Sequence, residues 1–122
     1  MKLAVIGLGY VGLPLAVSFG KQKVTVYGID VDKNKVKMLK NGESYVGDVL
    51  DKDIKELVDS GYLNPTSNYS ILKDADVVII CVPTPLRKSR EPDISYVLSV
   101  ANEVKKYLHK GQVIILESTV YP

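Results

Sequence analysis

The sequence predicts an α/β domain built on a doubly wound parallel sheet, and two observations carry this prediction. Short continuous apolar runs, typical of strands buried on both faces, alternate with segments of helical periodicity. Strands that alternate with helices imply right-handed crossovers and a sheet covered on both faces. The 122 residues are 46% hydrophobic and 25% charged, which suits one soluble domain.

The first strand and helix are expected near the N-terminus. Residues 3–6 form a continuous apolar run, and after a glycine-rich stretch apolar residues recur along one stripe of a helix. The stripe consists of Leu13, Ala16, Val17 and Gly20. Pro14 falls in the first turn of this helix, where a missing N–H costs little.

The middle of the chain continues the alternation. Residues 24–30 predict a second strand, and the lysine-rich residues 32–42 predict a helix that ends at Gly42. After a loop, Asp51 is a candidate N-cap for a short helix. Residues 62–67 predict a weak third strand, so the second crossover holds two short helices.

The last part of the chain contains the strongest strand pattern, at residues 76–83. A loop over 84–92 follows, and Asp93 is expected to cap a long helix. The predicted apolar face of this helix consists of Ile94, Val97, Leu98, Ala101, Val104 and Leu108. Residues 112–118 predict the final strand.

Composition excludes several classes of protein. The net charge of +2 is too small to argue for a nucleic-acid partner or an anionic membrane surface. No apolar run approaches the roughly 18 residues of a membrane helix, and no targeting signal is visible. Cys81 is the one cysteine, so no internal disulfide forms, as suits a reducing compartment. We expect a cytoplasmic protein with no nucleic-acid partner, no membrane partner and no metal site.

Three glycines after the first strand match the dinucleotide fingerprint G-x-G-x-x-G of the Rossmann fold. Gly7 permits a tight turn, Gly9 lets the backbone approach a pyrophosphate, and Gly12 allows the helix to lie close to the strand. The helix N-terminus offers free N–H groups and a positive dipole to phosphates. The competing interpretation is a glycine turn with no ligand. The fingerprint predicts the strand order 3-2-1-4-5.

Asp30 completes the fingerprint, because it ends the second strand about 20 residues after the glycines. Its carboxylate can accept hydrogen bonds from ribose hydroxyls and would repel a 2′-phosphate, which favours NAD over NADP. The alternative is a surface aspartate before a helix, although Asp32 could itself cap that helix. Lys33 and Lys35 nearby would suit a 2′-phosphate, but Asp30 occupies the contact position.

Five segments in this order, GLGYVGLPLA, GIDVDKNKV, CVPTPL, EPDISYV and LESTVYP, resemble the nucleotide-sugar 6-dehydrogenases, the family that includes UDP-glucose dehydrogenase. They cover nearly the whole chain. VPTPL, EPD and ESTVYP are most similar to the branch of enzymes that acts on UDP-N-acetylhexosamines. Within that branch they resemble the enzymes that act on UDP-N-acetylglucosamine most. The resemblance implies oxidation of the sugar C6 alcohol to a carboxylate with two NAD, through a thiohemiacetal and a thioester on a cysteine.

The resemblance also implies a set of cofactor contacts at the carboxyl edge of the sheet. These are Gly7, Gly9, Tyr10, Val11, Gly12, Asp30, Lys35, Val82, Pro83, Thr84, Glu117, Ser118 and Thr119. Thr119 is the implied catalytic residue, assisting at the nicotinamide through its hydroxyl and a water. Plainer interpretations exist: Lys35 as a solvated lysine, Thr84 as a residue that shapes its loop, and Thr119 as a hydroxyl bonded to backbone.

Members of this family run to several hundred residues, with an NAD domain, a central helix through which they dimerise, and a sugar-binding domain. We therefore expect residues 1–122 to be an NAD-binding Rossmann domain, truncated before the sixth strand, from a homodimeric enzyme whose UDP-sugar site lies mostly elsewhere. The family's catalytic cysteine lies in the later part. Cys81 falls in a buried strand, where cysteine is usually a small hydrophobe. The chain alone is expected to bind NAD without turning over UDP-sugar.

The last strand, residues 112–117, is expected at a sheet edge, where unpaired backbone and apolar side chains favour self-association. Three alternatives to a UDP-N-acetylhexosamine dehydrogenase stay open. One is the same domain of a UDP-glucose 6-dehydrogenase. Another is a stand-alone module that senses NAD or AMP, which would not need the threonine of ESTVYP. The third is a dehydrogenase of the 6-phosphogluconate or 3-hydroxyacid type, in which we would not expect VPTPL followed by EPD.

Overall fold

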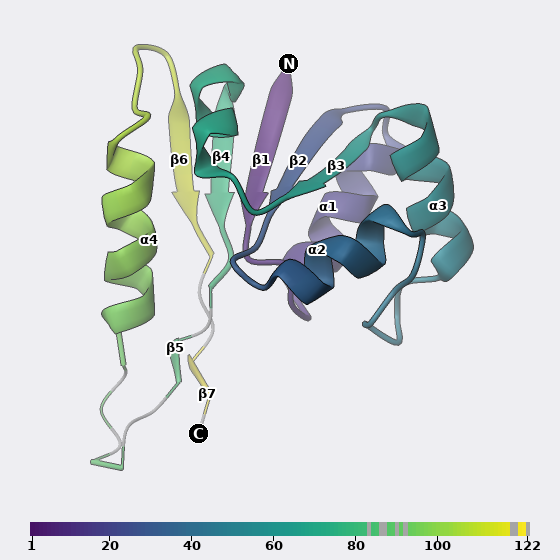
Figure 1. The fold of residues 1–122 in the computed structure, drawn as a ribbon. Helices are drawn as coiled ribbons and strands as arrows, with labels where there is room; N and C mark the ends of the chain where they lie inside the picture. The colour runs from purple at the N-terminus through teal and green to yellow at the C-terminus, as the bar shows by residue number, and fades with distance from the viewer. Residues whose placement is uncertain (83, 86–87, 90, 92, 118–119, 122) are drawn as a thin grey trace.

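A computed structural model describes residues 1–82, 84–85, 88–89, 91, 93–117 and 120–121. Its main sheet has five parallel strands in the order β3-β2-β1-β4-β6, which confirms the predicted α/β class and strand order (Figure 1). The strands are β1 (Lys2–Ile6), β2 (Thr25–Ile29), β3 (Leu63–Thr66), β4 (Val77–Ile80) and β6 (Val113–Leu116).

Helices cover both faces of the sheet (Figure 1). The elements on one face are α1 (Gly12–Lys21), α2 (Lys33–Lys40) and α3 (Asp51–Ser60), and those on the other are the 3-10 helix η1 (Tyr69–Asp74) and α4 (Ser95–Lys105). The central strand β1 explains why two layers form. Leu3 and Val5 lie in the core with α1 to α3, whereas Ala4 and Ile6 lie in the core with η1 and α4. Both faces of β1 are thus buried, as its continuous apolar run predicts.

The register brings the ends of four strands to one edge. Ile6, the last residue of β1, pairs with Ile29 of β2 and Ile80 of β4. Ile80 in turn pairs with Leu116 of β6. The residues that follow these strands therefore leave the sheet at the same carboxyl edge, where ligands bind in open α/β folds.

Two predicted helix starts have different outcomes. Asp32 caps α2, because its carboxylate accepts the N–H groups of Asn34 and Lys35 at 2.9 and 3.4 Å. The prediction that Asp51 caps α3 is wrong. Asp51 is the first residue of the helix, and its Oδ1 accepts the N–H of Ser44 at 2.8 Å. That bond connects the loop before α3 to the helix, and the local sequence pattern does not predict it.

The predicted apolar face of α4 is wrong at most of its positions. Val104 is buried and Val97 half-buried, but Ile94, Leu98 and Leu108 are each 50% exposed or more. Ala101 is exposed as well, and the helix spans only Ser95–Lys105. Apolar residues occupy more than one stripe of this helix, so periodicity alone cannot select the stripe that meets the sheet.

The start of α4 lies two residues after the predicted cap. Asp93 Oδ1 accepts the N–H of Ser95 at 3.0 Å and its hydroxyl at 2.6 Å. The aspartate therefore still binds a free donor of the first turn, as a capping side chain does.

A second, two-stranded sheet was not predicted. β5 (Thr84–Pro85) lies in the segment expected to be a loop, and it pairs in parallel with β7 (Val120–Tyr121). Strands of two residues are too short to carry an alternating pattern. The pairing joins the loop after β4 to the segment after β6, beyond the carboxyl edge of the main sheet (Figure 1).

β6 lies at the edge of the main sheet, as predicted. Val113, Ile114, Ile115 and Leu116 are 40–55% exposed, so apolar side chains are accessible on both faces of this strand. None of the helices in the described part of the chain has the length and apolar character that crossing a membrane requires.

Candidate functional site

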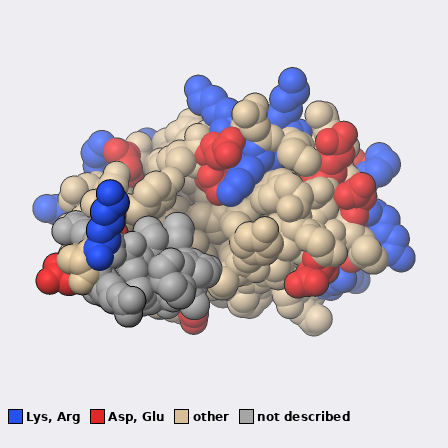
Figure 2. All heavy atoms as spheres, turned by 90° about the horizontal axis from the view of Figure 1, so that it is seen from below, with Lys and Arg blue, Asp and Glu red and all other residues tan. Residues whose placement is uncertain are grey.

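A pocket of about 460 Å³ opens at the carboxyl edge of the sheet. Its walls come from the loop after β1, the end of β2, the start of α2, the segment after β4, η1 and α4. Eight residues expected to contact the cofactor line it: Gly7, Gly9, Tyr10, Val11, Asp30, Lys35, Val82 and Glu117. Figure 2 views the molecule from this edge, with acidic and basic side chains mostly toward the periphery.

Two of the three glycines are required by the protein's own packing. Gly7 has φ +93°, and a Cβ there would collide with the carbonyl oxygen of Cys81. A Cβ at Gly12 would collide with the carbonyl oxygen of Gly7. These contacts let β1, α1 and the end of β4 lie close together.

Gly9 is different, because a Cβ there would meet nothing within 4 Å and its φ is not positive. No neighbouring atom in the described structure accounts for a glycine at this position. Gly9 lines the pocket, so the space that a side chain would fill is open to a ligand. A diphosphate that approaches the backbone here fits this arrangement, and a simple turn between packed elements does not explain it.

The start of α1 is free to bind an anion. Val11 precedes the helix, no described side chain caps its N–H groups, and its first turn has no acidic residue. Leu13 and Leu15 donate their N–H groups to the carbonyls of Gly9 and Val11, and Pro14 has no N–H. The Gly12 N–H is the first-turn donor that no described residue accepts, and together with the helix dipole it attracts a negatively charged group.

Asp30 is held in place by two backbone amides. Its Oδ2 accepts the N–H of Leu8 and its Oδ1 accepts the N–H of Asp32, both at 2.9 Å. Each oxygen keeps a second lone pair with which it can accept a hydroxyl. Asp32 is engaged at the start of α2, so Asp30 is the half-buried acid that lines the pocket.

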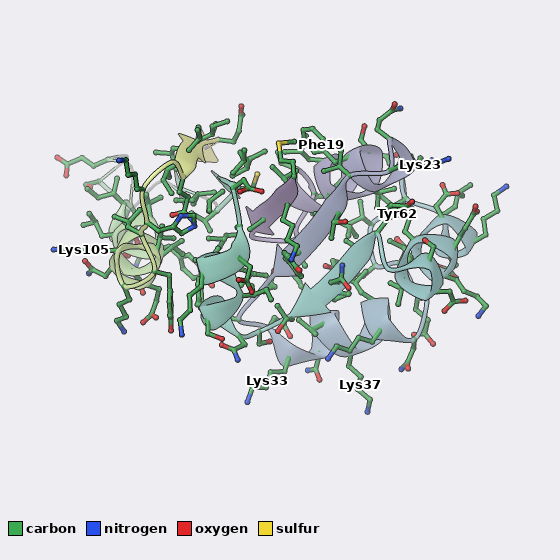
Figure 3. The ribbon with its side chains drawn as sticks, turned by 90° about the horizontal axis from the view of Figure 1, so that it is seen from above. Phe19, Lys23, Lys33, Lys37, Tyr62 and Lys105 are labelled. Carbon is green, nitrogen blue, oxygen red and sulfur yellow. The ribbon has the colours of Figure 1, made fainter. Side chains whose placement is uncertain are left out.

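Lys35 also lines the pocket, and its surroundings differ from those of the other lysines of α2. Its side chain is half-buried, with Nζ 5.5 Å from the ring centroid of Tyr45. Lys33 and Lys37 are exposed and extend away from the sheet (Figure 3).

The far wall of the pocket was not predicted. It is formed by Tyr69 of η1 together with Tyr96 and Val100 of α4. Burial raises the pKa of the Tyr69 hydroxyl to about 12, with smaller contributions from Tyr96, Glu103 and Asp30. The hydroxyl therefore stays protonated at neutral pH. One signal in the sequence could have revealed this wall. Tyr96 lies in the predicted first turn of α4, and that helix follows a loop at the carboxyl edge of the sheet.

Cys81 lies directly after β4 and is only 8% exposed. Burial, with a smaller contribution from the charge of Glu117, raises the pKa of its thiol to about 11. A thiol that stays protonated at neutral pH is a poor nucleophile, which agrees with the structural role expected from the sequence.

Part of the predicted site has no structural account. Pro83, Ser118 and Thr119 lie outside the described residues, and for Thr84 only the backbone pairing in β5 is described. The role of Thr119 at the nicotinamide therefore stays a prediction from resemblance.

Comparison with known proteins gives one family. The model of the UDP-glucose/GDP-mannose dehydrogenase family, NAD binding domain, matches residues 1–122. Among curated relatives, UDP-N-acetyl-D-glucosamine 6-dehydrogenase of Pseudomonas aeruginosa is 41% identical over 122 residues. That alignment covers 100% of this chain and 28% of the relative.

Solved structures give the same result. UDP-D-ManNAc dehydrogenase from Pyrococcus horikoshii superposes with a TM-score of 0.90 at 36% identity, over 98% of this chain and 28% of that one. GDP-mannose dehydrogenase from Pseudomonas aeruginosa, in a ternary complex, has a TM-score of 0.91 at 29% identity, over 98% of this chain and 29% of that one. The chain thus spans less than a third of the length of these proteins.

Proposed function

This chain belongs to the UDP-glucose/GDP-mannose dehydrogenase family as its NAD-binding domain, and we propose that it supplies the NAD site of a UDP-N-acetylhexosamine 6-dehydrogenase. The whole enzyme would oxidise the C6 alcohol of the sugar to a carboxylate. The proposal rests on one pocket that is lined both by the open position of Gly9 and by Asp30, whose carboxylate binds the amide of Leu8 next to Gly9. The choice of a UDP-N-acetylhexosamine is supported by the names of curated relatives. These are UDP-N-acetyl-D-glucosamine 6-dehydrogenases and a UDP-N-acetyl-D-mannosamine dehydrogenase.

We assign the diphosphate of NAD to the loop between β1 and α1. Gly9 and Val11 line the pocket there, and the start of α1 supplies the N–H of Gly12 and a positive dipole. Gly7 and Gly12 shape this loop through their close contacts with neighbouring backbone.

We assign the adenosine ribose to Asp30, whose oxygens are positioned by the amides of Leu8 and Asp32. The charge of Asp30 disfavours a 2′-phosphate and so favours NAD over NADP. Lys35, which lines the same pocket, completes this end of the site.

Bound NAD would supply the hydride acceptor for both oxidation steps. Val82 and Glu117 follow β4 and β6 and line the same pocket, so we place the nicotinamide end toward these strands. Thr119 would assist there through its hydroxyl. The buried, protonated thiol of Cys81 is unsuited to the covalent step, so this chain alone would bind NAD without oxidising the sugar. Homodimer formation by the whole enzyme, in the cytoplasm, belongs to the same proposal.

Two measurements test the proposal. Calorimetric titration of the chain should show binding of NAD and weaker binding of NADP; absence of NAD binding contradicts it. The whole enzyme that contains this chain should form NADH from NAD with UDP-N-acetylglucosamine or UDP-N-acetylmannosamine. Faster turnover of UDP-glucose than of either hexosamine would contradict the choice of substrate and leave the NAD site in place.

A further inference from the structure

The loop between α2 and α3 reaches the dinucleotide loop through a single side chain. Tyr45, which lies 37 residues from Leu8 in sequence, donates its hydroxyl hydrogen to the Leu8 carbonyl oxygen at 2.6 Å. The N–H of the same residue donates to Asp30 Oδ2 at 2.9 Å. Both polar backbone groups of Leu8 are therefore held by side chains from other parts of the fold.

These two bonds matter because Leu8 lies between Gly7 and Gly9, and glycine restricts the backbone less than any other residue. A peptide unit is planar, and the described part of the chain contains no cis peptide bond. The Leu8 carbonyl and the Gly9 N–H therefore belong to one rigid plane and point in opposite directions. A bond that fixes the Leu8 carbonyl also fixes the direction of the Gly9 N–H, which no described residue accepts.

Tyr45 is itself well anchored. The neighbouring Val46 and Val49 are buried in the core with α1 to α3, and Ser44 binds the Val46 carbonyl and Asp51. Lys35 lies near the face of the Tyr45 ring. Burial, followed by the charges of Asp30 and Asp32, raises the pKa of the Tyr45 hydroxyl above its ordinary value, so it remains a donor at neutral pH.

We propose that Tyr45 is a positioning residue of the NAD site: its hydroxyl fixes the Leu8–Gly9 peptide so that the Gly9 N–H is set to donate to the diphosphate. This inference rests on the proposed function, because it concerns the same site. The sequence between α2 and α3 thus contributes to cofactor binding through the backbone of the loop.

The test compares Tyr45→Phe with the wild-type chain. The variant removes one oxygen and keeps the ring that packs beside Lys35, so it should fold. We expect its dissociation constants for NAD and ADP-ribose to rise by about 3- to 10-fold, the effect of losing one hydrogen bond. In the NMR spectrum the Gly9 amide resonance should shift, and the Leu8 amide should exchange faster while amides of β1 and β4 keep their protection.

Tyr62→Phe is the matched control. Tyr62 is half-buried, and with Lys23 it lines a second, smaller cleft that shares no residue with the pocket at the dinucleotide loop. Its variant should bind NAD as the wild type does. Two results would overturn the role of Tyr45 and leave the proposed function in place. One is unchanged NAD affinity in Tyr45→Phe, and the other is weaker binding with a uniform loss of amide exchange protection throughout the sheet. Failure of the wild-type chain to bind NAD would contradict the proposed function and the inference together.

Discussion

The carboxylate of Asp30 accepts the amide of Leu8 at 2.9 Å, and this bond joins the end of β2 to the loop after β1. The two residues are 22 positions apart in sequence. The glycine-rich loop and the acid, which form the two halves of the dinucleotide fingerprint, are therefore coupled within the protein itself. A substitution at either half should therefore affect the other.

Alanine at Gly9 should separate ligand binding from stability. A Cβ there meets no protein atom, so Gly9→Ala should melt close to the wild-type temperature, yet bind NAD at least about tenfold more weakly because the methyl group occupies space the diphosphate needs. Gly12→Ala should instead lower the free energy of unfolding by about 1–3 kcal/mol, because its Cβ meets the Gly7 carbonyl. Thermal melts and calorimetry measure both effects.

Gly47→Ala is the control for that comparison. Gly47 also has open space around its Cβ position, but it does not line the pocket. Its NAD affinity should equal that of the wild type. If Gly9→Ala and Gly47→Ala bind NAD equally well, the loop does not hold the diphosphate.

Asp30→Ala should weaken NAD binding by roughly 1.5–3 kcal/mol, the range for a hydrogen bond to a charged group. It should also narrow the preference for NAD over NADP, because the charge that repels a 2′-phosphate is gone. Asp32→Asn is the matched control, since asparagine also caps helices and Asp32 does not line the pocket. Titrations with both nucleotides that give Asp30→Ala the wild-type affinities would remove Asp30 from the site.

The Cys81 thiol should resist alkylation at neutral pH. Its pKa is about 11, against 9.0 for an ordinary thiol, so in the folded chain it stays protonated until the pH approaches 11. The unfolded chain loses this proton first, and the stability from keeping the thiol neutral should therefore be lost as pH rises from 9 to 11. Iodoacetamide labelling, with and without urea, measures the difference. Rapid labelling of the folded chain at pH 7 would show that the Cys81 thiol is neither buried nor held protonated.

The exposed edge strand β6 should cause the chain to self-associate. Ile115 is 42% exposed and follows Ile114 at 40%, beside an unpaired strand edge. Ile115→Lys should reduce association, because a charge on an edge strand opposes pairing with a second copy. Leu50→Lys, at an exposed apolar position before α3, is the control and should not reduce it. Sedimentation that finds the wild type monomeric over a wide concentration range would count against this edge.

The sequence predicts the parts of this fold that local pattern determines. β1 is identifiable because Leu3 and Ala4 are buried on opposite faces, which yields a continuous apolar run. The glycine loop is identifiable because Gly7 and Gly12 must avoid specific backbone atoms. Both are consequences of short-range geometry.

The remainder depends on contacts that no local pattern contains. α4 is apolar on two stripes, so only the sheet decides that Val100 is buried and Leu98 is not. Tyr69 and Tyr96 reach the pocket from elements whose placement is set by the whole chain. Tyr45 meets Leu8 across 37 residues, and nothing in the spacing of either residue predicts that bond.

We expect NAD to bind in the carboxyl-edge pocket, and an NMR titration of the chain with NAD measures this directly. Amides of Leu8, Gly9, Val11 and Asp30 should shift with saturable concentration dependence. Amides around the smaller cleft of about 220 Å³ between α1 and α3, such as those of Lys23 and Tyr62, should not shift. Shifts confined to that smaller cleft, or no saturable shift at the glycine loop, would contradict this expectation.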